Sequence, residues 1–190
     1  MRKLIHFSEM TLDGYFEGKK AWDLSFLQEV PDREIGPYTD QMNRDTGVLI
    51  FGRKTYEGNA AHFPTLTDDF SKVLNAVPKI VFSRTLTKVD WNNTTLERGP
   101  PERVVRRLKR TRGKDLYLVG SAQLASTLRE HDLIDEFRIW LNPAILGRGN
   151  PLFPPNSKGT PLDLLEARSV KSGCVLLRYK LRKPRRRRTR

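Results

Sequence analysis

The sequence predicts an α/β protein with a central, mostly parallel sheet and an antiparallel hairpin at its C-terminal end. Across the first two-thirds of the chain, short apolar runs alternate with stretches of helical periodicity, which is the pattern of parallel strands joined by helices. The last third ends in two apolar runs, 162–167 and 174–181, separated by a short polar stretch. Two such runs in succession indicate a hairpin added to the edge of the sheet.

The expected strands of the parallel part are short and rich in β-branched or aromatic residues. The run Val48-Leu49-Ile50-Phe51 is too short for a helix and stops at Gly52, as a buried strand does. In residues 137–141 apolar side chains alternate with Arg138 and Trp140, the period of a strand covered on one face. The other expected strands are 3–7, 78–82, 89–96 and 116–119.

Helical periodicity fills the intervals between these strands. In 31–45 the pattern is broken, because Ile35-Gly36-Pro37 disfavours a continuous helix. Pro100-Pro101-Glu102 marks a helix start, since proline and acidic residues suit a first turn, and Gly113 ends that helix. The remaining expected helices are a short one after Gly52 that ends before Pro64, one over 68–75 and one after Ala122.

Two segments have no clear period. Residues 13–30 follow the Asp13-Gly14 turn, and a long irregular segment of this kind is usually a lid or a binding loop. Within it, Trp22 and Phe26 would either cap a pocket or close the core. The second segment, 143–153, is a loop punctuated by glycines.

Length and charge define one domain and one tail. The 190 residues fit a single domain, which we place at 1–182, followed by a basic tail, 183–190, expected to be disordered. The net charge is +13, but the tail holds six of the 35 basic residues, which leaves 29 basic against 22 acidic residues. The basic helix 103–112 and the tail would suit nucleic acid or another polyanion, or would simply be solvated.

Other classes of protein find little support in the composition. No apolar run approaches the length of about 18 residues that crosses a membrane, and no signal peptide is present, so we expect a cytoplasmic protein without membrane contacts. Cys174 is the only cysteine, which excludes an intrachain disulfide. The three histidines, His6, His62 and His131, lie far apart in the sequence, so no metal site is expected.

The junctions between strands and helices point to an anion site. After the strand that ends at Gly52, Arg53 and Lys54 add positive charge and Thr55 adds a hydroxyl beside the free N–H groups of a helix start. A second strand is followed by the small residues Gly120-Ser121-Ala122. Two such junctions could hold the two ends of a dinucleotide.

A third strand ends at Ser83-Arg84. Ligands of open α/β sheets bind outside the carboxyl ends of the strands, which is where all three junctions fall. The sequence contains neither the Gly-x-Gly-x-x-Gly fingerprint nor an NTPase phosphate loop, so the common nucleotide folds are not indicated.

Taken in order, these motifs resemble the dihydrofolate reductase-like superfamily, and more closely the branch of the reductase domain of bifunctional riboflavin-biosynthesis deaminase-reductases. The resemblance covers nearly all of 1–182 and implies a three-layer fold with a central, largely parallel sheet of eight strands. It rests on Leu12-Asp13-Gly14, residues 52–57, Ser83-Arg84, residues 119–122 and the loop 143–153.

The resemblance also implies that the cofactor is NADPH. Gly52, Arg53, Lys54 and Thr55 would bind its phosphates, with Arg53 on the 2′-phosphate or the pyrophosphate, because a guanidinium fork matches phosphate geometry. Ser83 and Arg84 would lie on the adenosine side. Gly120, Ser121 and Ala122 would direct backbone N–H groups at the pyrophosphate.

The implied activity is an NADPH-dependent reduction of a small heterocyclic substrate, pterin- or pyrimidine-like, by a homodimeric enzyme. Asp13 and Tyr56 are the candidate catalytic residues, although Asp13 could merely form its turn and Tyr56 could pack beneath the loop. Asp13, Trp22 and Tyr38 are the candidate substrate contacts.

Two departures from the family pattern leave the substrate open. Dihydrofolate reductase carries an acidic residue on the helix that precedes the strand corresponding to the one that ends here at Gly52-Arg53. None of residues 34–40 clearly occupies the matching position. The zinc signature of the deaminase half is absent from the sequence. A cofactor-fold protein that binds without catalysis is therefore a further alternative.

Overall fold

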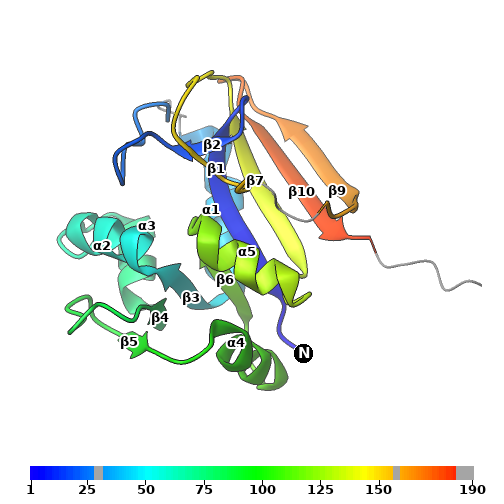
Figure 1. Ribbon diagram of the computed structural model, residues 1–190. Helices are drawn as coiled ribbons and strands as arrows, with labels where there is room; N and C mark the ends of the chain where they lie inside the picture. Colours follow the sequence, from blue (N-terminus) through cyan, green and yellow to red (C-terminus); the bar gives the residue numbers. More distant parts are fainter. Residues whose placement is uncertain (28–31, 156–158, 183–190) are drawn as a thin grey trace, which may run out of the picture.

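The computed structural model describes residues 1–27, 32–155 and 159–182 and shows a sheet between two layers of helices (Figure 1). In the described part of the chain the sheet has eight strands in the order β5-β4-β3-β6-β1-β7-β10-β9. Six of them run parallel to one another: β1 (Leu4–Thr11), β3 (Thr46–Gly52), β4 (Lys79–Phe82), β5 (Thr94–Glu97), β6 (Asp115–Val119) and β7 (Glu136–Asn142).

The C-terminal strands β9 (Leu162–Ser169) and β10 (Val175–Leu181) form the predicted antiparallel hairpin, and β10 pairs with β7. A separate ribbon joins β2 (Tyr15–Glu17) to β8 (Asn150–Pro151). This ribbon places the two irregular segments of the sequence side by side above the sheet.

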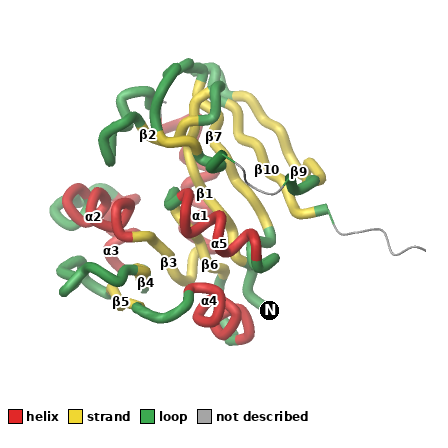
Figure 2. Tube along the Cα trace, in the orientation of Figure 1, coloured by secondary structure: helices red, strands yellow, loops and turns green. Residues whose placement is uncertain are grey.

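Five helices cover the two faces in the described residues (Figure 2). One face carries α4 (Pro101–Arg110) and α5 (Ala122–Glu130), whose apolar residues share a core cluster with Leu116 and Leu118 of β6. The other carries α1 (Asp32–Asp45), α2 (Arg53–His62) and α3 (Asp69–Ala76), which pack over Leu49 and Phe51 of β3. The predicted three-layer architecture is confirmed.

Two element predictions were wrong in detail. Residues 32–45 form one helix despite Pro37, because this proline stands near the helix start, where its missing N–H costs a single backbone bond. The strand expected over 89–96 begins only at Thr94. Trp91 lies in the preceding turn instead, with its indole N–H donated to Asn75 at 2.6 Å. The tail expected at 183–190 lies outside the described residues.

Parallel pairing brings three strand ends to one edge. Gly52 of β3 pairs with Phe82 of β4, and β3 also runs beside β6, whose last residue is Val119. The junctions that follow these strands therefore meet above the carboxyl end of the sheet, as the sequence predicted.

Candidate active site

The Ser121 side chain ties the junction after Gly52 to the junction at Gly120-Ser121-Ala122. The backbone N–H of Gly52 donates to Ser121 Oγ at 2.9 Å, and the same oxygen lies 2.9 Å from Thr55 Oγ1. A Cβ at position 52 would lie 3.4 Å from Ser121 Oγ, which is ordinary van der Waals contact, so Gly52 and Ser121 are close neighbours. The sequence predicted both junctions, and the structure shows that they form one unit.

The start of α5 has an unusual backbone. Gly120 and Ser121 both have left-handed conformations, with φ of 51° and 57°. Gly120 O accepts a hydrogen bond of 2.9 Å from Nε2 of His6, which is fully buried beneath it. Burial lowers the pKa of His6 to about 4, and within the described residues its Nδ1 has no partner. His6 is therefore a neutral support for the turn.

The N-termini of α2 and α5 face one cleft of about 850 Å³. Neither helix has a hydrogen bond from its N-cap side chain, so first-turn N–H groups remain available to an anion. Eight of the nine predicted cofactor contacts line this cleft: Gly52, Arg53, Lys54, Thr55, Ser83, Arg84, Ser121 and Ala122.

Arg98 is a further positively charged residue of the cleft, and no sequence pattern singled it out. Its guanidinium donates to the backbone oxygens of Arg84 and Leu86, which fixes the turn after β4. Ser83 Oγ is also occupied in this turn, because it accepts the N–H groups of Thr85 and Leu86. An arginine in a loop carries no sequence signal of such a role.

A smaller, mainly apolar cavity of about 430 Å³ adjoins the cleft. Thr55, Phe16 and Glu17 line both spaces, so the two adjoin at these residues. Gly120, the ninth predicted cofactor contact, lines the smaller cavity. Its other walls include the aromatic residues Phe7, Trp22, Phe51, Phe63 and Phe70.

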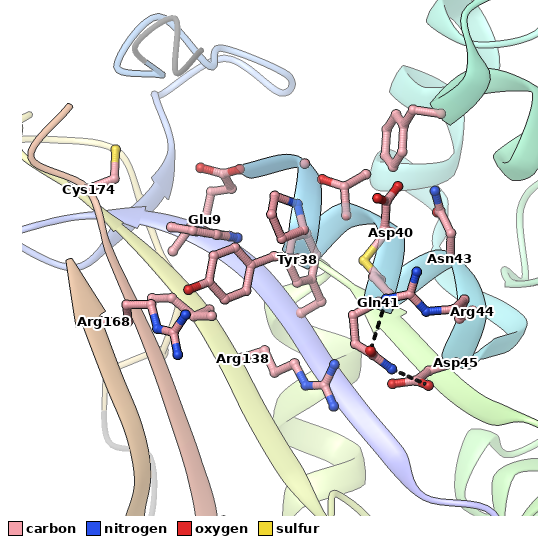
Figure 3. Close-up of a pocket in the computed structure, with 18 of the residues that line it drawn as sticks. Glu9, Tyr38, Asp40, Gln41, Asn43, Arg44, Asp45, Arg138, Arg168 and Cys174 are labelled. Carbon is pink, nitrogen blue, oxygen red and sulfur yellow. Dashed lines mark hydrogen bonds between the residues drawn. The ribbon is translucent and has the colours of Figure 1, made fainter. Parts of the chain in front are cut away.

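A third cavity, of about 1470 Å³, lies between α1 and the strands β7, β10 and β9 (Figure 3). It shares Phe7, Glu9 and Met42 with the smaller cavity. The three cavities thus form a series, with the apolar one in the middle. Glu9, which no sequence pattern singled out, lines both the apolar cavity and the large cavity.

Trp22 and Tyr38 lie where a substrate could reach them. Trp22 lines the apolar cavity, is 37% exposed and packs against Gly58 of α2. Tyr38 lines the large cavity, where its ring stands edge-on to Trp140 and below the guanidinium of Arg168. Within the described part of the chain the Tyr38 hydroxyl is buried without a hydrogen bond.

Asp13, a candidate catalytic residue, holds a loop through its carboxylate, and its catalytic role stays a prediction. Its carboxylate accepts hydrogen bonds from the Thr11 hydroxyl at 2.6 Å and from the backbone N–H of Gly147 at 2.7 Å. The Thr11 hydroxyl above all holds the pKa of Asp13 below its usual range. Asp13 lines none of the three cavities and clasps the loop that follows β7 instead.

Tyr56, the other candidate catalytic residue, also has its polar group occupied, and its catalytic role stays a prediction. Tyr56 is buried, and its hydroxyl accepts the backbone N–H groups of Asp90 and Trp91 at 3.2 and 3.1 Å. None of the three cavities reaches it. This tyrosine packs beneath the site, the alternative that its position in the sequence had left open.

The described residues form neither a metal cluster nor a membrane-spanning helix. No group of three or more His, Cys, Asp or Glu side chains among the described residues is placed to hold a metal ion. No described helix is long and apolar enough to cross a membrane.

The fold and the cleft together define an α/β protein of the dihydrofolate reductase-like class with a nucleotide-sized groove at the strand ends. The chain belongs to the family of the RibD C-terminal domain, whose model matches residues 2–176. Its relatives include the uncharacterized protein YyaP of Bacillus subtilis, 32% identical over an alignment of 188 residues that covers 94% of each chain.

Solved structures share the fold. A putative riboflavin biosynthesis protein of Shewanella matches with a TM-score of 0.78 and 22% identity, over 95% of this chain and 99% of that one. A diaminohydroxyphosphoribosylaminopyrimidine deaminase/5-amino-6-(5-phosphoribosylamino)uracil reductase of Thermotoga maritima matches with a TM-score of 0.67 and 14% identity, over 95% of this chain and 56% of that one.

Proposed function

We propose that this protein is an NADPH-dependent reductase that transfers a hydride to a small heterocyclic substrate of the pyrimidine or pterin type. The observation that supports it most is the Ser121 link, which holds two uncapped helix starts together at the wall of one cleft. Two helix N-termini and the flanking cations suit the phosphates of a dinucleotide. Family membership supports the reaction class.

The arrangement of the cleft and the apolar cavity supports this proposal. The phosphates would lie against Gly52–Thr55 and the start of α5, the adenosine side against Ser83 and Arg84, and the nicotinamide in the apolar cavity beyond Thr55. The bound cofactor would supply the hydride, and the protein would position the substrate beside it. Trp22 and Tyr38 are the proposed substrate contacts.

The first test is cofactor preference. The Arg53 guanidinium is partly exposed and bonded to Glu57 at 3.1 Å, so it can turn to a phosphate without leaving a buried charge unpaired. We expect Arg53→Ala to weaken NADPH binding by about 2 kcal/mol, a loss of roughly thirtyfold, and NADH binding much less. Nicotinamide fluorescence during titration measures both affinities.

Arg106→Ala is the matched control, because Arg106 is exposed on α4 and lines none of the cavities. It should leave both affinities unchanged. Equal affinity of the wild-type protein for the two cofactors would contradict the proposed 2′-phosphate contact, and absent binding of both would overturn the function. Turnover is then sought with NADPH and 5-amino-6-(5-phosphoribosylamino)uracil, followed by related pyrimidines and pterins.

We also propose that the enzyme is a homodimer. The edge strand β9 exposes Leu164 and Leu165 by 56% and 45%, and an uncovered edge with apolar side chains favours pairing with a second chain. Sedimentation equilibrium should then give twice the chain mass of 22.0 kDa. A single-chain mass at micromolar concentration would contradict this assembly.

A further inference from the structure

The junction between the apolar cavity and the large cavity contains one carboxyl group that can face a ligand. Glu9 of β1 lines both spaces. Its Oε2 accepts a hydrogen bond of 2.9 Å from Asn142 of β7. No residue in the described part of the chain donates to Oε1 or forms an ion pair with Glu9, so this oxygen is available to a bound molecule.

The surroundings hold Glu9 in place and favour its neutral form. Burial raises the pKa of Glu9, and the hydrogen bond from Asn142 partly opposes that rise. Asn142 is itself fixed, because its Oδ1 accepts the thiol of Cys174 at 3.6 Å. A half-buried carboxyl group with one hydrogen-bonded oxygen and one oxygen without a protein donor is suited to donate a proton.

Other titratable groups near these cavities are less well placed. Glu17 also lines the apolar cavity, but its two oxygens accept the N–H groups of Trp22 and Asn150. Asp40 is exposed on α1, and His62 is exposed at the end of α2. The remaining titratable or charged groups that line the large cavity with Glu9 are Tyr38, Arg44, Asp45, Asp68, Asp69, Arg138, Glu166, Arg168, Cys174 and Arg178, several of which Figure 3 shows.

We propose that Glu9 is the proton donor of the reduction, an inference that rests on the proposed reductase function. The substrate carbon would accept the hydride from the reduced nicotinamide in the apolar cavity. The heteroatom double-bonded to that carbon would take the proton from the Glu9 carboxyl group. The substrate thereby gains two electrons, the nicotinamide is oxidised, and Glu9 becomes a carboxylate that is reprotonated by water from the large cavity.

This role also explains why α1, the helix before β3, needs no acidic residue at the position where dihydrofolate reductase carries one. In this chain the carboxyl group comes from β1, two strands away from β3, and reaches the space between the cavities from the sheet. The substrate would enter through the large cavity and meet the nicotinamide at Glu9.

The kinetic test compares single turnovers of Glu9→Gln and of the wild-type protein. Each protein is loaded with NADPH and mixed with 5-amino-6-(5-phosphoribosylamino)uracil, or with whichever related pyrimidine or pterin the wild-type protein reduces. Glutamine keeps the shape and can still accept from Asn142. We expect hydride transfer to fall at least a hundredfold. The wild-type rate should fall as pH rises through the Glu9 pKa, whereas the residual rate of the variant should lack this dependence. NADPH affinity should stay within twofold.

Glu130→Gln is the matched control, since Glu130 is exposed on α5 and lines none of the three cavities. Its rate and pH profile should equal those of the wild type. A rate and pH profile of Glu9→Gln that equal those of the wild type would overturn the assignment of Glu9. A wild-type protein that binds NADPH but reduces no acceptor would instead overturn the reductase function itself, which keeps the two failures distinct.

A second measurement needs no substrate. In protein labelled with ¹³C at the glutamate side-chain carboxyl carbon, the resonance missing from Glu9→Gln identifies Glu9. We expect this resonance to titrate at higher pH than those of exposed glutamates and to shift when NADP⁺ binds. Titration together with the exposed glutamates, or no response to NADP⁺, would overturn the proposal.

Discussion

At the scale of single residues, His6 shows how a buried group supports the site without touching a ligand. Its ring donates to Gly120 O, and protonation would add an N–H at Nδ1 that has no acceptor among the described residues. The folded protein therefore keeps the imidazole neutral at pH values where the unfolded chain protonates it. Stability must depend on pH through this residue.

The direction of this pH dependence follows from the pKa of His6 in the folded and in the unfolded chain. The folded pKa is about 4 and lies below the ordinary value of 6.5, so the contribution of His6 is present above pH 6.5 and is lost as pH falls toward 4. We expect the free energy of unfolding to fall on the order of 3 kcal/mol further in the wild type than in His6→Gln between pH 7 and pH 4.

Urea unfolding at the two pH values measures this difference. Glutamine places an amide N–H near the position of Nε2 and does not titrate in this range, so it preserves the bond to Gly120. Parallel pH profiles for the two proteins would show that His6 is not the group responsible.

At the scale of elements, α2 and the loop after β2 act as one unit. The Trp22 ring lies directly on Gly58, and its backbone N–H is held by Glu17 at 3.0 Å. Trp22 has a left-handed backbone with φ of 65°, which a tryptophan adopts only when its surroundings hold it. The absence of a side chain at position 58 lets the loop cover the apolar cavity.

A methyl group at this position should displace the loop. A Cβ on residue 58 would overlap the indole, and overpacking of this kind costs about 1–3 kcal/mol. We expect trypsin to cleave Gly58→Ala after Lys19 or Lys20 roughly tenfold faster than the wild type. Mass spectrometry of timed digests measures the rate.

Gly36→Ala provides the control, because a Cβ at that position of α1 meets nothing within 4 Å. Its cleavage after Lys19 and Lys20 should match that of the wild type. Equal cleavage of Gly58→Ala would mean that Trp22 does not hold the loop closed.

At the scale of the whole molecule, positive charge is spread over three places: the cleft at the strand ends, helix α4 and the tail. Several α4 arginines are exposed, whereas Lys109 is buried and pairs with Asp135. The basic face expected on this helix is therefore smaller than its sequence suggested. The tail alone takes the net charge from +7 to +13.

Removal of residues 183–190 should separate polyanion binding from cofactor binding. We expect any affinity for a 20-base-pair DNA duplex to depend steeply on salt and to be lost with the tail, because six cations are removed. NADPH affinity should stay within twofold. Fluorescence anisotropy of labelled duplex at several salt concentrations measures the first quantity, and retained salt-dependent binding would place the polyanion site on α4.

The sequence by itself determined the order of strands and helices and the positions of the strand ends. Short β-branched runs and helical periods are local signals, so β3, β6 and the C-terminal hairpin were predicted closely. The parallel order then predicted that Gly52, Ser83 and Gly120 would meet at one edge, since parallel strands point their carboxyl ends the same way.

Only the tertiary structure decided which polar side chains reach a cavity. Asp13 is occupied by a loop more than 130 residues later in the chain, and Tyr56 by backbone N–H groups 34 and 35 residues away. Glu9, in contrast, has one oxygen facing a space bounded by segments distant in sequence. Such partners are set by long-range packing, and no local pattern of residues encodes them.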